Sequence, residues 1–327
     1  MAKLELKTEI ASILADGNFH SGEELGQLFG VSRTAISNHV KALIDLGLDI
    51  FSVHGKGYKL AESIDLLNAE EIRQGLGNSN SIDVFPIIDS TNEFLMTKIR
   101  NSDHISDGHT VLAECQTSGR GRRGRTWVSP FGSHIYFSQY RKMEDGLAAA
   151  SGLSLAVGVA VKNACQAITG LELQLKWPND ILYQKQKVAG ILVEAEGQSD
   201  GVCHLVIGIG INVDMPQGSA EQIDQPWTDL KQLSERQINR NEIAIELCHQ
   251  LNIVMGEYRE HRLDNLYKEW NLANAFKDSM VNIIANKNTQ TGRCLGIDQS
   301  GALIVENPAD GSRFKVFGGE VSLRGVA

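Results

Sequence analysis

An arginine- and glycine-rich segment, GRGRRGRTW at residues 119–127, carries the most evident chemistry in the sequence. Four of its nine residues are arginines and three are glycines. Glycine lets backbone N–H groups approach an anion closely, and arginine offers a fixed fork of donors that matches phosphate or carboxylate. The composition therefore predicts a loop that wraps a polyanionic substrate. A solvated basic loop and a contact for single-stranded nucleic acid are the alternatives.

The glycines of this segment also match the pattern G-x-G-x-x-G of dinucleotide-binding loops. That motif lies between a strand and a helix that begins directly after it. Residues 110–116 are strand-like, but residues 125–139 read as a turn followed by another strand. This context excludes a dinucleotide-binding loop.

The segment DSTNEF, residues 89–94, places Ser90, Thr91 and Asn92 at the start of a predicted helix. Hydroxyl and N–H groups at a helix N-terminus can bind the polar head of a ligand. Ser90 and Glu93 also have the spacing of a capping box, so stabilisation of the helix alone is the alternative.

Three strand ends carry the remaining candidates. KWPND, residues 176–180, contains a lysine and an aspartate around a proline turn, which form either a surface ion pair or an acid/base and phosphate-binding pair. KVAGILVE, residues 187–194, puts a lysine at the mouth of an apolar strand. GIGIN, residues 208–212, ends another strand with glycines, where a ligand can press on the backbone. Each segment alone is explained as well by structure as by function.

Residues 1–65 read as a winged helix-turn-helix. Ser21 and Glu24 have the spacing of a capping box, and Ser32 caps a second helix after a glycine turn. A hairpin with glycines at its tip is predicted for residues 49–60. We expect the two helices to bury Leu25, Leu28, Ile36, Val40, Leu43 and Ile44.

The second of these helices is the candidate for DNA binding, within a helix-turn-helix at residues 22–41. The side chains that can reach base edges and phosphates are Ser32, Arg33, Thr34, Ser37, Asn38 and Lys41. Residues 1–66 contain six lysines and arginines against nine aspartates and glutamates, so a single module should bind DNA weakly. A dimer that presents two such helices to two half-sites would compensate. An ordinary helical domain with a glycine turn is the alternative.

The rest of the chain divides into two further parts. Residues 66–275 alternate strands and helices and predict a mixed sheet with flanking helices. Residues 276–327 are short alternating strands between Gly, Asn and Asp turns, which predict a small β-barrel. The longest apolar run, residues 147–161, is short for a membrane span and indicates a buried helix.

Composition limits the possible functions. The net charge of −9 disfavours nonspecific nucleic-acid binding by the whole surface, so any such contact must be local. The five cysteines are scattered and never form C-x-x-C, which fits a reduced, cytoplasmic protein without a structural zinc site.

Taken in order, five motifs resemble those of the biotin–protein ligases. They are S-T-N from residue 90, Q-x-x-G-R-G-R-R-G-R-x-W from 116, K-W-P-N-D from 176, K-x-A-G-I-L-V-E from 187 and G-I-G-I-N from 208. With its N-terminal winged helix, essentially the whole chain resembles the bifunctional type, which is also the repressor of the biotin operon. The resemblance implies an α+β multidomain fold: a winged helix-turn-helix (1–65), a mixed-sheet catalytic domain related to class II synthetases (66–275) and a small SH3-like β-barrel (276–327).

In that family, biotin and ATP are joined into biotinyl-5′-AMP with release of pyrophosphate, and biotin then passes to a lysine of the biotin carboxyl carrier protein of acetyl-CoA carboxylase. The resemblance assigns biotin binding to Ser90, Thr91, Asn92, Gln116, Arg120, Gly121, Arg122, Lys187 and Gly190. It assigns nucleotide binding to Arg120, Arg122, Lys187, Asn212 and Trp227. It assigns catalysis to Lys187, Arg122, Asp180 and Lys176, with Asp180 as our candidate for the base that takes the proton of the acceptor lysine.

The resemblance also implies Mg²⁺, for which the sequence fixes no ligands. Biotinyl-5′-AMP would act as corepressor, and the adenylate-bound protein would form a homodimer on operator DNA. A protein ligase for lipoate or octanoate and a ligand-sensing transcription regulator without ligase activity are the alternative functions. A dedicated nucleic-acid-binding protein is a third, and it predicts an affinity that depends on salt but not on ligand.

Overall fold

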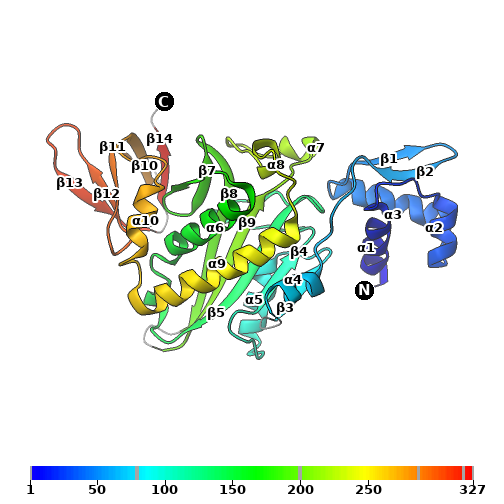
Figure 1. The fold of residues 1–327 in the computed structure, drawn as a ribbon, viewed down its shortest axis with the longest axis horizontal. Coiled ribbons are helices and arrows are strands. Elements are labelled where there is room, and N and C mark those ends of the chain that lie inside the picture. The colour runs from blue at the N-terminus through cyan, green and yellow to red at the C-terminus, as the bar shows by residue number, and fades with distance from the viewer. Residues whose placement is uncertain (1, 78–80, 198–200, 286–287, 319–320, 326–327) are drawn as a thin grey trace.

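The computed structural model describes residues 2–77, 81–197, 201–285, 288–318 and 321–325. Three units follow one another along the molecule (Figure 1): a small unit of three helices and a hairpin, a large α/β unit, and a C-terminal antiparallel sheet. The expected α+β class is confirmed, with a mixed sheet in the centre.

The N-terminal unit has the arrangement predicted for a winged helix-turn-helix. Its elements are α1 (Ala2–Leu14), α2 (Gly22–Phe29), α3 (Arg33–Asp45), β1 (Ile50–Val53) and β2 (Gly57–Leu60). The two strands pair antiparallel and form the wing.

The predicted helix caps of this unit are present. The Ser21 hydroxyl accepts a hydrogen bond from the Glu24 N–H at 3.0 Å, and the Glu24 carboxylate accepts from the Ser21 N–H at 3.3 Å. Gly30 ends α2 with φ 66°, and Ser32 accepts from the Ala35 N–H at 3.2 Å. The turn between α2 and α3 is therefore fixed at both ends.

Two predicted core positions of this unit are exposed. Leu28 is 66% exposed and Ile44 45%, whereas Leu25 is buried. The buried face of α2 is centred on Gly22, Leu25 and Gly26, so Leu28 lies to the side of it. Ile44 borders a cleft between this unit and the central one. Ile36, Val40 and Leu43 are buried as expected.

The central unit is built on a seven-stranded sheet in the order β3-β4-β5-β9-β8-β7-β6. The strands are β3 (Ile82–Phe85), β4 (Thr110–Ala113), β5 (His134–Met143), β6 (Gln174–Lys176), β7 (Asp180–Tyr183), β8 (Gln186–Gly197) and β9 (Cys203–Asn212). Only the pair β3–β4 is parallel among the pairs of this sheet within the described residues. The sheet is therefore mixed, as predicted.

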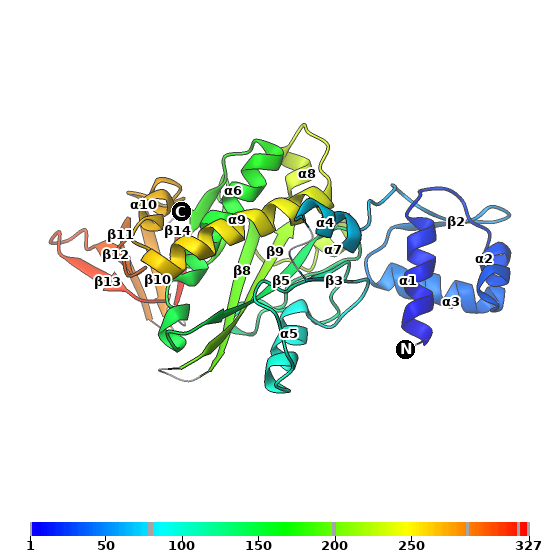
Figure 2. The same ribbon diagram turned by 60° about the horizontal axis from the view of Figure 1, so that its bottom comes forward.

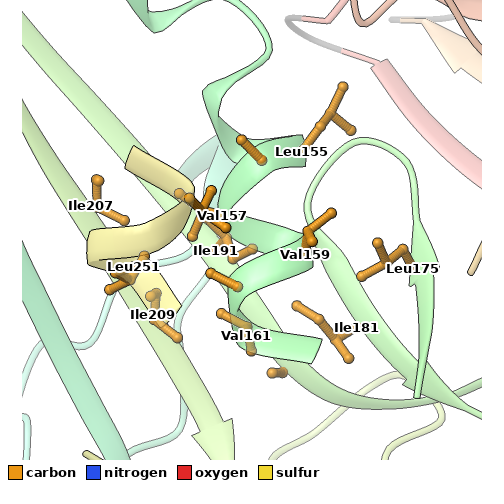
Figure 3. Packing of buried hydrophobic residues seen from close by; sticks show 14 of the residues in the cluster. Leu155, Val157, Val159, Val161, Leu175, Ile181, Ile191, Ile207, Ile209 and Leu251 are labelled. Atoms are coloured by element: carbon orange, nitrogen blue, oxygen red, sulfur yellow. The ribbon is translucent and has the colours of Figure 1, made fainter. Parts of the chain in front are cut away.

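Helices cover both faces of this sheet. The long helices α6 (Leu153–Thr169) and α9 (Arg240–His261) lie side by side on one face (Figure 2). Valines of α6 and Leu251 of α9 meet Ile191 of β8 and Ile207 and Ile209 of β9 there (Figure 3). Most of the apolar run at 147–161 falls in α6, which is buried as predicted. On the other face, α5 (Thr91–Arg100) packs against Val206 of β9.

Shorter elements connect these layers. They are α4 (Ala69–Gly75), the 3₁₀ turns η1 (Arg122–Gly124) and η2 (Leu147–Ala150), α7 (Gln217–Ala220), α8 (Leu230–Leu233) and α10 (Leu266–Leu272). The described helices include none that is long and apolar enough to span a membrane.

The C-terminal unit is a five-stranded antiparallel sheet in the order β13-β12-β11-β10-β14. Its strands are β10 (Met280–Ala285), β11 (Asn288–Ile297), β12 (Leu303–Glu306), β13 (Arg313–Val316) and β14 (Val321–Gly325). Within the described residues no pairing joins β13 to β14, so closure into an SH3-like barrel stays a prediction.

The N-terminal unit is not independent of the central one. Phe131 of the central unit is buried in the N-terminal core and donates its N–H to the Leu46 carbonyl at 3.1 Å. Arg240 forms a buried ion pair with Glu114 and also donates to the Asp65 carbonyl at 2.6 Å. It thereby holds residues 61–68, the segment between the two units, against the central unit. The domain boundary at residue 65 stays a prediction, since the N-terminal core also contains Ile87, Cys115 and Phe131, which follow that boundary.

Candidate active site

The candidate active site is a cavity on the sheet face opposite α6 and α9. Gly208 and Gly210 of β9 and Gly190 of β8 form its floor. A Cβ atom added at Gly208 would lie 2.3 Å from the Asn92 side chain, and one at Gly210 would lie 2.4 Å from the Trp127 ring. The sequence predicted that a ligand presses on the backbone at Gly208 and Gly210. In the structure the side chains of Asn92 and Trp127 make this close approach, so contact with a ligand stays a prediction.

A connected set of polar side chains forms one wall. Gln116 accepts from the Thr91 N–H at 2.9 Å and donates to the Ser129 hydroxyl at 3.2 Å. The Ser138 hydroxyl, at the centre of β5, donates to the Asn92 amide oxygen at 2.5 Å and lies 2.7 Å from the Thr91 hydroxyl. Buried polar groups that satisfy one another in this way form a rigid wall. Neither Ser129 nor Ser138 was among the site residues predicted from the sequence.

Ser90 caps α5 rather than reaching far into the cavity. Its hydroxyl accepts from the Glu93 N–H at 3.4 Å. The reciprocal half of the predicted capping box is replaced, because the Ser90 N–H donates to Asp89 at 2.6 Å. The Glu93 carboxylate is thereby left for other partners.

The arginine hairpin (residues 119–127) covers the cavity. Gly121 donates its N–H to the Arg125 carbonyl at 2.7 Å, and Trp127 donates to Gly119 at 2.9 Å. η1 turns at its tip, where Arg123 has φ 61° and Gly124 φ 70°. The segment is a folded β-like hairpin, and no α-helix follows it, in agreement with the exclusion of a dinucleotide-binding loop.

The four arginines of the hairpin divide into two pairs. Arg123 and Arg125 are exposed. Arg120 and Arg122 turn inward and line the cavity. Arg122 donates to Asn179 at 2.9 Å, and burial lowers its pKa, partly offset by the nearby Asp180 carboxylate. A guanidinium remains charged under such conditions, so the hairpin places two cationic side chains at the cavity.

A second group of charges lies at the end of the cavity. The Lys187 ammonium is 2.7 Å from Asp180 Oδ1, and the Lys176 ammonium is 3.3 Å from Asp180 Oδ2. Burial alone would raise the pKa of Asp180, but the two lysines outweigh burial and hold its pKa below the ordinary value. The aspartate is therefore ionised, and both its oxygens are engaged.

Nine residues predicted for biotin binding all line this cavity. They are Ser90, Thr91, Asn92, Gln116, Arg120, Gly121, Arg122, Lys187 and Gly190. Lys176 and Asp180 are not among the lining residues. Asp180 is connected to the cavity by its ion pair with Lys187, and Lys176 by its ion pair with Asp180. The structure thus gathers residues that lie up to about a hundred positions apart in the sequence.

Trp127, the last residue of the arginine hairpin, lines the cavity, although it was not among the predicted site residues. The Lys187 ammonium lies 5.2 Å from the centre of its ring. Its indole Nε1 and the Arg120 Nε are both buried, and neither has a hydrogen-bond acceptor among the described residues. Buried donors of this kind are usually satisfied, so the pair indicates that a ligand supplies acceptors here.

The predicted nucleotide residues Asn212 and Trp227 lie beside the cavity rather than in its lining. The Asn212 amide donates to the carbonyls of Lys187 at 3.3 Å and Thr228 at 3.1 Å. Trp227 is half-buried and forms a parallel bridge with Lys187. Their roles toward the nucleotide stay predictions, and in the structure both brace the backbone of Lys187.

The predicted DNA-contacting side chains lie on α3, away from this cavity. Arg33, Thr34, Asn38 and Lys41 are exposed, and Ser37 is half-buried. Ser32 uses its hydroxyl to cap the helix. α3 thus presents a polar face to solvent, as a recognition helix requires.

Comparison with known proteins identifies the family. The chain is 40% identical to the bifunctional ligase/repressor BirA of Salmonella typhimurium over 315 residues, which are 96% of each protein. It is 39% identical to the corresponding protein of Escherichia coli over 316 residues, 97% of this chain and 96% of that one. The chain belongs to the family of bifunctional biotin ligases and repressors. The expected family, a biotin–[acetyl-CoA-carboxylase] ligase joined to a DNA-binding repressor module, is confirmed.

Two further comparisons agree with this family. A model of the biotin/lipoate A/B protein ligase family matches residues 84–212, and a model of a helix-turn-helix domain matches residues 7–59. The solved biotin protein ligase from Aquifex aeolicus in complex with biotin and ATP is similar with a TM-score of 0.63 and 26% identity, over 75% of this chain and 99% of that one. Full-length similarity to ligases that are also repressors favours the biotin function over the alternatives, a lipoate or octanoate ligase and a regulator without ligase activity.

Proposed function

We propose that this cavity joins biotin and ATP into biotinyl-5′-AMP and then passes biotin to a lysine of a biotin carboxyl carrier protein. The convergence of Lys187, Arg120 and Arg122 on one glycine-floored cavity carries the proposal. In the first step a carboxylate oxygen of biotin attacks the α-phosphorus of ATP, and the bond to pyrophosphate breaks. Both reactants are anions, so fixed cationic donors lower the free energy of their approach.

The polar wall suits the head of biotin. Gln116, Thr91 and Ser129 are already joined by hydrogen bonds, so they would bind a urea-like group without reorganising. The Nε–H of Arg120 and the indole N–H of Trp127 lack acceptors among the described residues, and the ligand's oxygens would provide them.

The second step needs a neutral amine from the acceptor lysine. Deprotonating a lysine of ordinary pKa at pH 7 costs about 4–5 kcal/mol. Asp180 is the residue that the sequence analysis suggests as the base for the proton of the acceptor lysine. Its lowered pKa and its two lysine partners favour a different role, which is to hold Lys187 and Lys176 in place.

Mg²⁺ would enter with the nucleotide. The described residues contain no cluster of three His, Cys, Asp or Glu side chains that could hold a metal ion. Mg²⁺ is commonly held through substrate phosphates rather than by an all-protein cage. A site that binds the ion together with ATP is therefore compatible with these residues. When bound, the ion would neutralise charge on the phosphates.

We further propose that the adenylate-bound chain forms a homodimer that binds operator DNA, with biotinyl-5′-AMP as corepressor. An open sheet edge supports this: β7 pairs with β8 only up to Gly190, so in the described sheet residues 193–197 pair on one side only, with β9. A free strand edge is a template for pairing with another chain. The carrier protein and a second copy would compete for it.

A cytoplasmic location is part of the same proposal. All five cysteines are buried and unpaired, which suits a reducing compartment.

The proposed reaction is tested by incubating the full-length protein with labelled biotin and a carrier domain, with and without ATP. We expect ATP-dependent labelling of one carrier lysine together with pyrophosphate release. Labelling that does not require ATP, or pyrophosphate release with lipoate but not biotin, would contradict the proposal.

A further inference from the structure

Arg120 is bound by two carboxylates that belong to different elements. Its Nη1 lies 3.1 Å from Oε2 of Glu93, in the first turn of α5. Its Nη2 lies 2.7 Å from Oε2 of Glu194, on β8. These contacts tie the arginine hairpin to α5 and to β8, and neither glutamate is among the predicted site residues.

Each carboxylate is itself held in position. Oε1 of Glu93 accepts from Arg100 at 2.7 Å, and Oε2 of Glu194 accepts from the Asn92 amide at 2.8 Å. Carboxylates fixed by a second partner lose less side-chain entropy when they bind a guanidinium. Their ion pairs with Arg120 are therefore stronger than isolated surface pairs.

Stabilisation of α5 alone does not explain Glu93. In a capping box its carboxylate would accept from the Ser90 N–H, but that N–H donates to Asp89. Both Glu93 oxygens point to arginines instead, one on α5 and one on the hairpin. The geometry is that of a connection between two elements.

We propose that Glu93 and Glu194, the latch carboxylates, fasten the arginine hairpin over the bound adenylate through Arg120. They are positioning residues, since they act on the ligand only through that arginine. Opening the hairpin requires breaking both ion pairs, so the latch sets how long the adenylate stays enclosed. This inference rests on the proposed function and on the prediction that the arginine-rich segment wraps its substrate, that is, on closure of the hairpin over the adenylate.

The test measures release of preformed biotinyl-AMP from the full-length protein without an acceptor, after a chase with unlabelled biotin and ATP. The variants are Glu93→Gln, Arg120→Met and the double variant. Glu93→Gln should release adenylate about fivefold faster, the size expected for one ion pair between partly exposed groups. In the Arg120→Met background the same substitution should have no further effect, because its partner is gone.

Glu196→Gln is the matched control. Glu196 also lies on β8 and is 3.5 Å from Arg100, but it has no ion pair with Arg120 among the described residues. Its release rate should equal that of the parent protein. Thermal unfolding of each variant checks that α5 is intact.

Two results would overturn the latch. One is an unchanged release rate in Glu93→Gln; the other is an effect of Glu93→Gln that persists undiminished when Arg120 is methionine, which would place its action in α5. If Arg122→Gly still accelerates release, closure of the hairpin stands without the latch. If no arginine variant accelerates release, the proposed closure fails as well.

Discussion

Among individual side chains, the unit of Lys176, Asp180 and Lys187 governs the reactive end of the cavity. A buried carboxylate between two ammonium groups keeps its charge, as the lowered pKa of Asp180 indicates. Such a carboxylate is a weak base toward a lysine, whose ordinary pKa lies more than six units higher. Its geometry favours orientation of Lys187 over proton transfer.

Asp180→Asn tests this assignment. Replacing the carboxylate with an amide removes a charge-assisted hydrogen bond that contributes about 1.5–3 kcal/mol, so we expect adenylate formation and biotin transfer each to slow by about 10- to 100-fold. Single-turnover rates of the two half-reactions, measured separately, give the answer. Slowing of transfer alone would restore Asp180 as the base.

Among the elements, the strands that form the cavity floor could be predicted better than what covers them. The glycines at the end of β9 and the lysine at the start of β8 were recognised from the sequence, and so were the helix start at Ser90 and the turn after Trp127. Trp127 itself was given no role, because a single tryptophan in a loop has no periodicity. Only its contact with Gly190 and Gly210, distant in sequence, shows its place. Apolar spacing likewise predicted burial of Leu28 and Ile44, but it could not show that they are left exposed among the described residues.

Gly210→Ala tests the floor. The added methyl group would lie 2.4 Å from the Trp127 ring and displace it. We expect the KM for biotin to rise at least about tenfold, the size of a one-methylene misfit in a packed pocket. Steady-state kinetics check this. Gly158→Ala is the control, since its methyl group would meet nothing closer than 3.5 Å and kinetics should not change.

For the chain as three units, the sequence predicted the order of the units but not how they are joined. The alternation of strands and helices is a local property, whereas the Arg240–Glu114 pair and the packing of Phe131 into the N-terminal core connect residues far apart in sequence. The open edge of β8 also could not be predicted from the sequence, because it depends on the residue at which pairing with β7 ends.

Ala195→Pro tests that edge as the dimer surface. The Ile191 N–H faces away from β9, toward Asn179, so the N–H of Ala195, four residues on, faces the same way. Proline removes this donor without touching the pairing with β9. Sedimentation with biotin and ATP should show a monomer, and operator affinity should fall at least about tenfold. Ala195→Ser should dimerise normally. If the proline variant still forms a dimer with the adenylate, the edge of β8 is not the dimer surface.

The central claim is that the arginine hairpin closes over biotinyl-5′-AMP and retains it. The most direct measurement compares adenylate release from the parent protein and from Arg122→Gly, read as labelling of lysines on a bystander protein. Arg122 is half-buried and bonded to Asn179 at the far side of the cavity, so its loss should open the hairpin. Because Arg122 is also a predicted catalytic residue, bystander labelling is divided by the amount of adenylate formed. We predict that this ratio rises at least about tenfold, because the variant loses one charge-assisted hydrogen bond. Bystander labelling equal to that of the parent, with adenylate formation intact, would contradict the account.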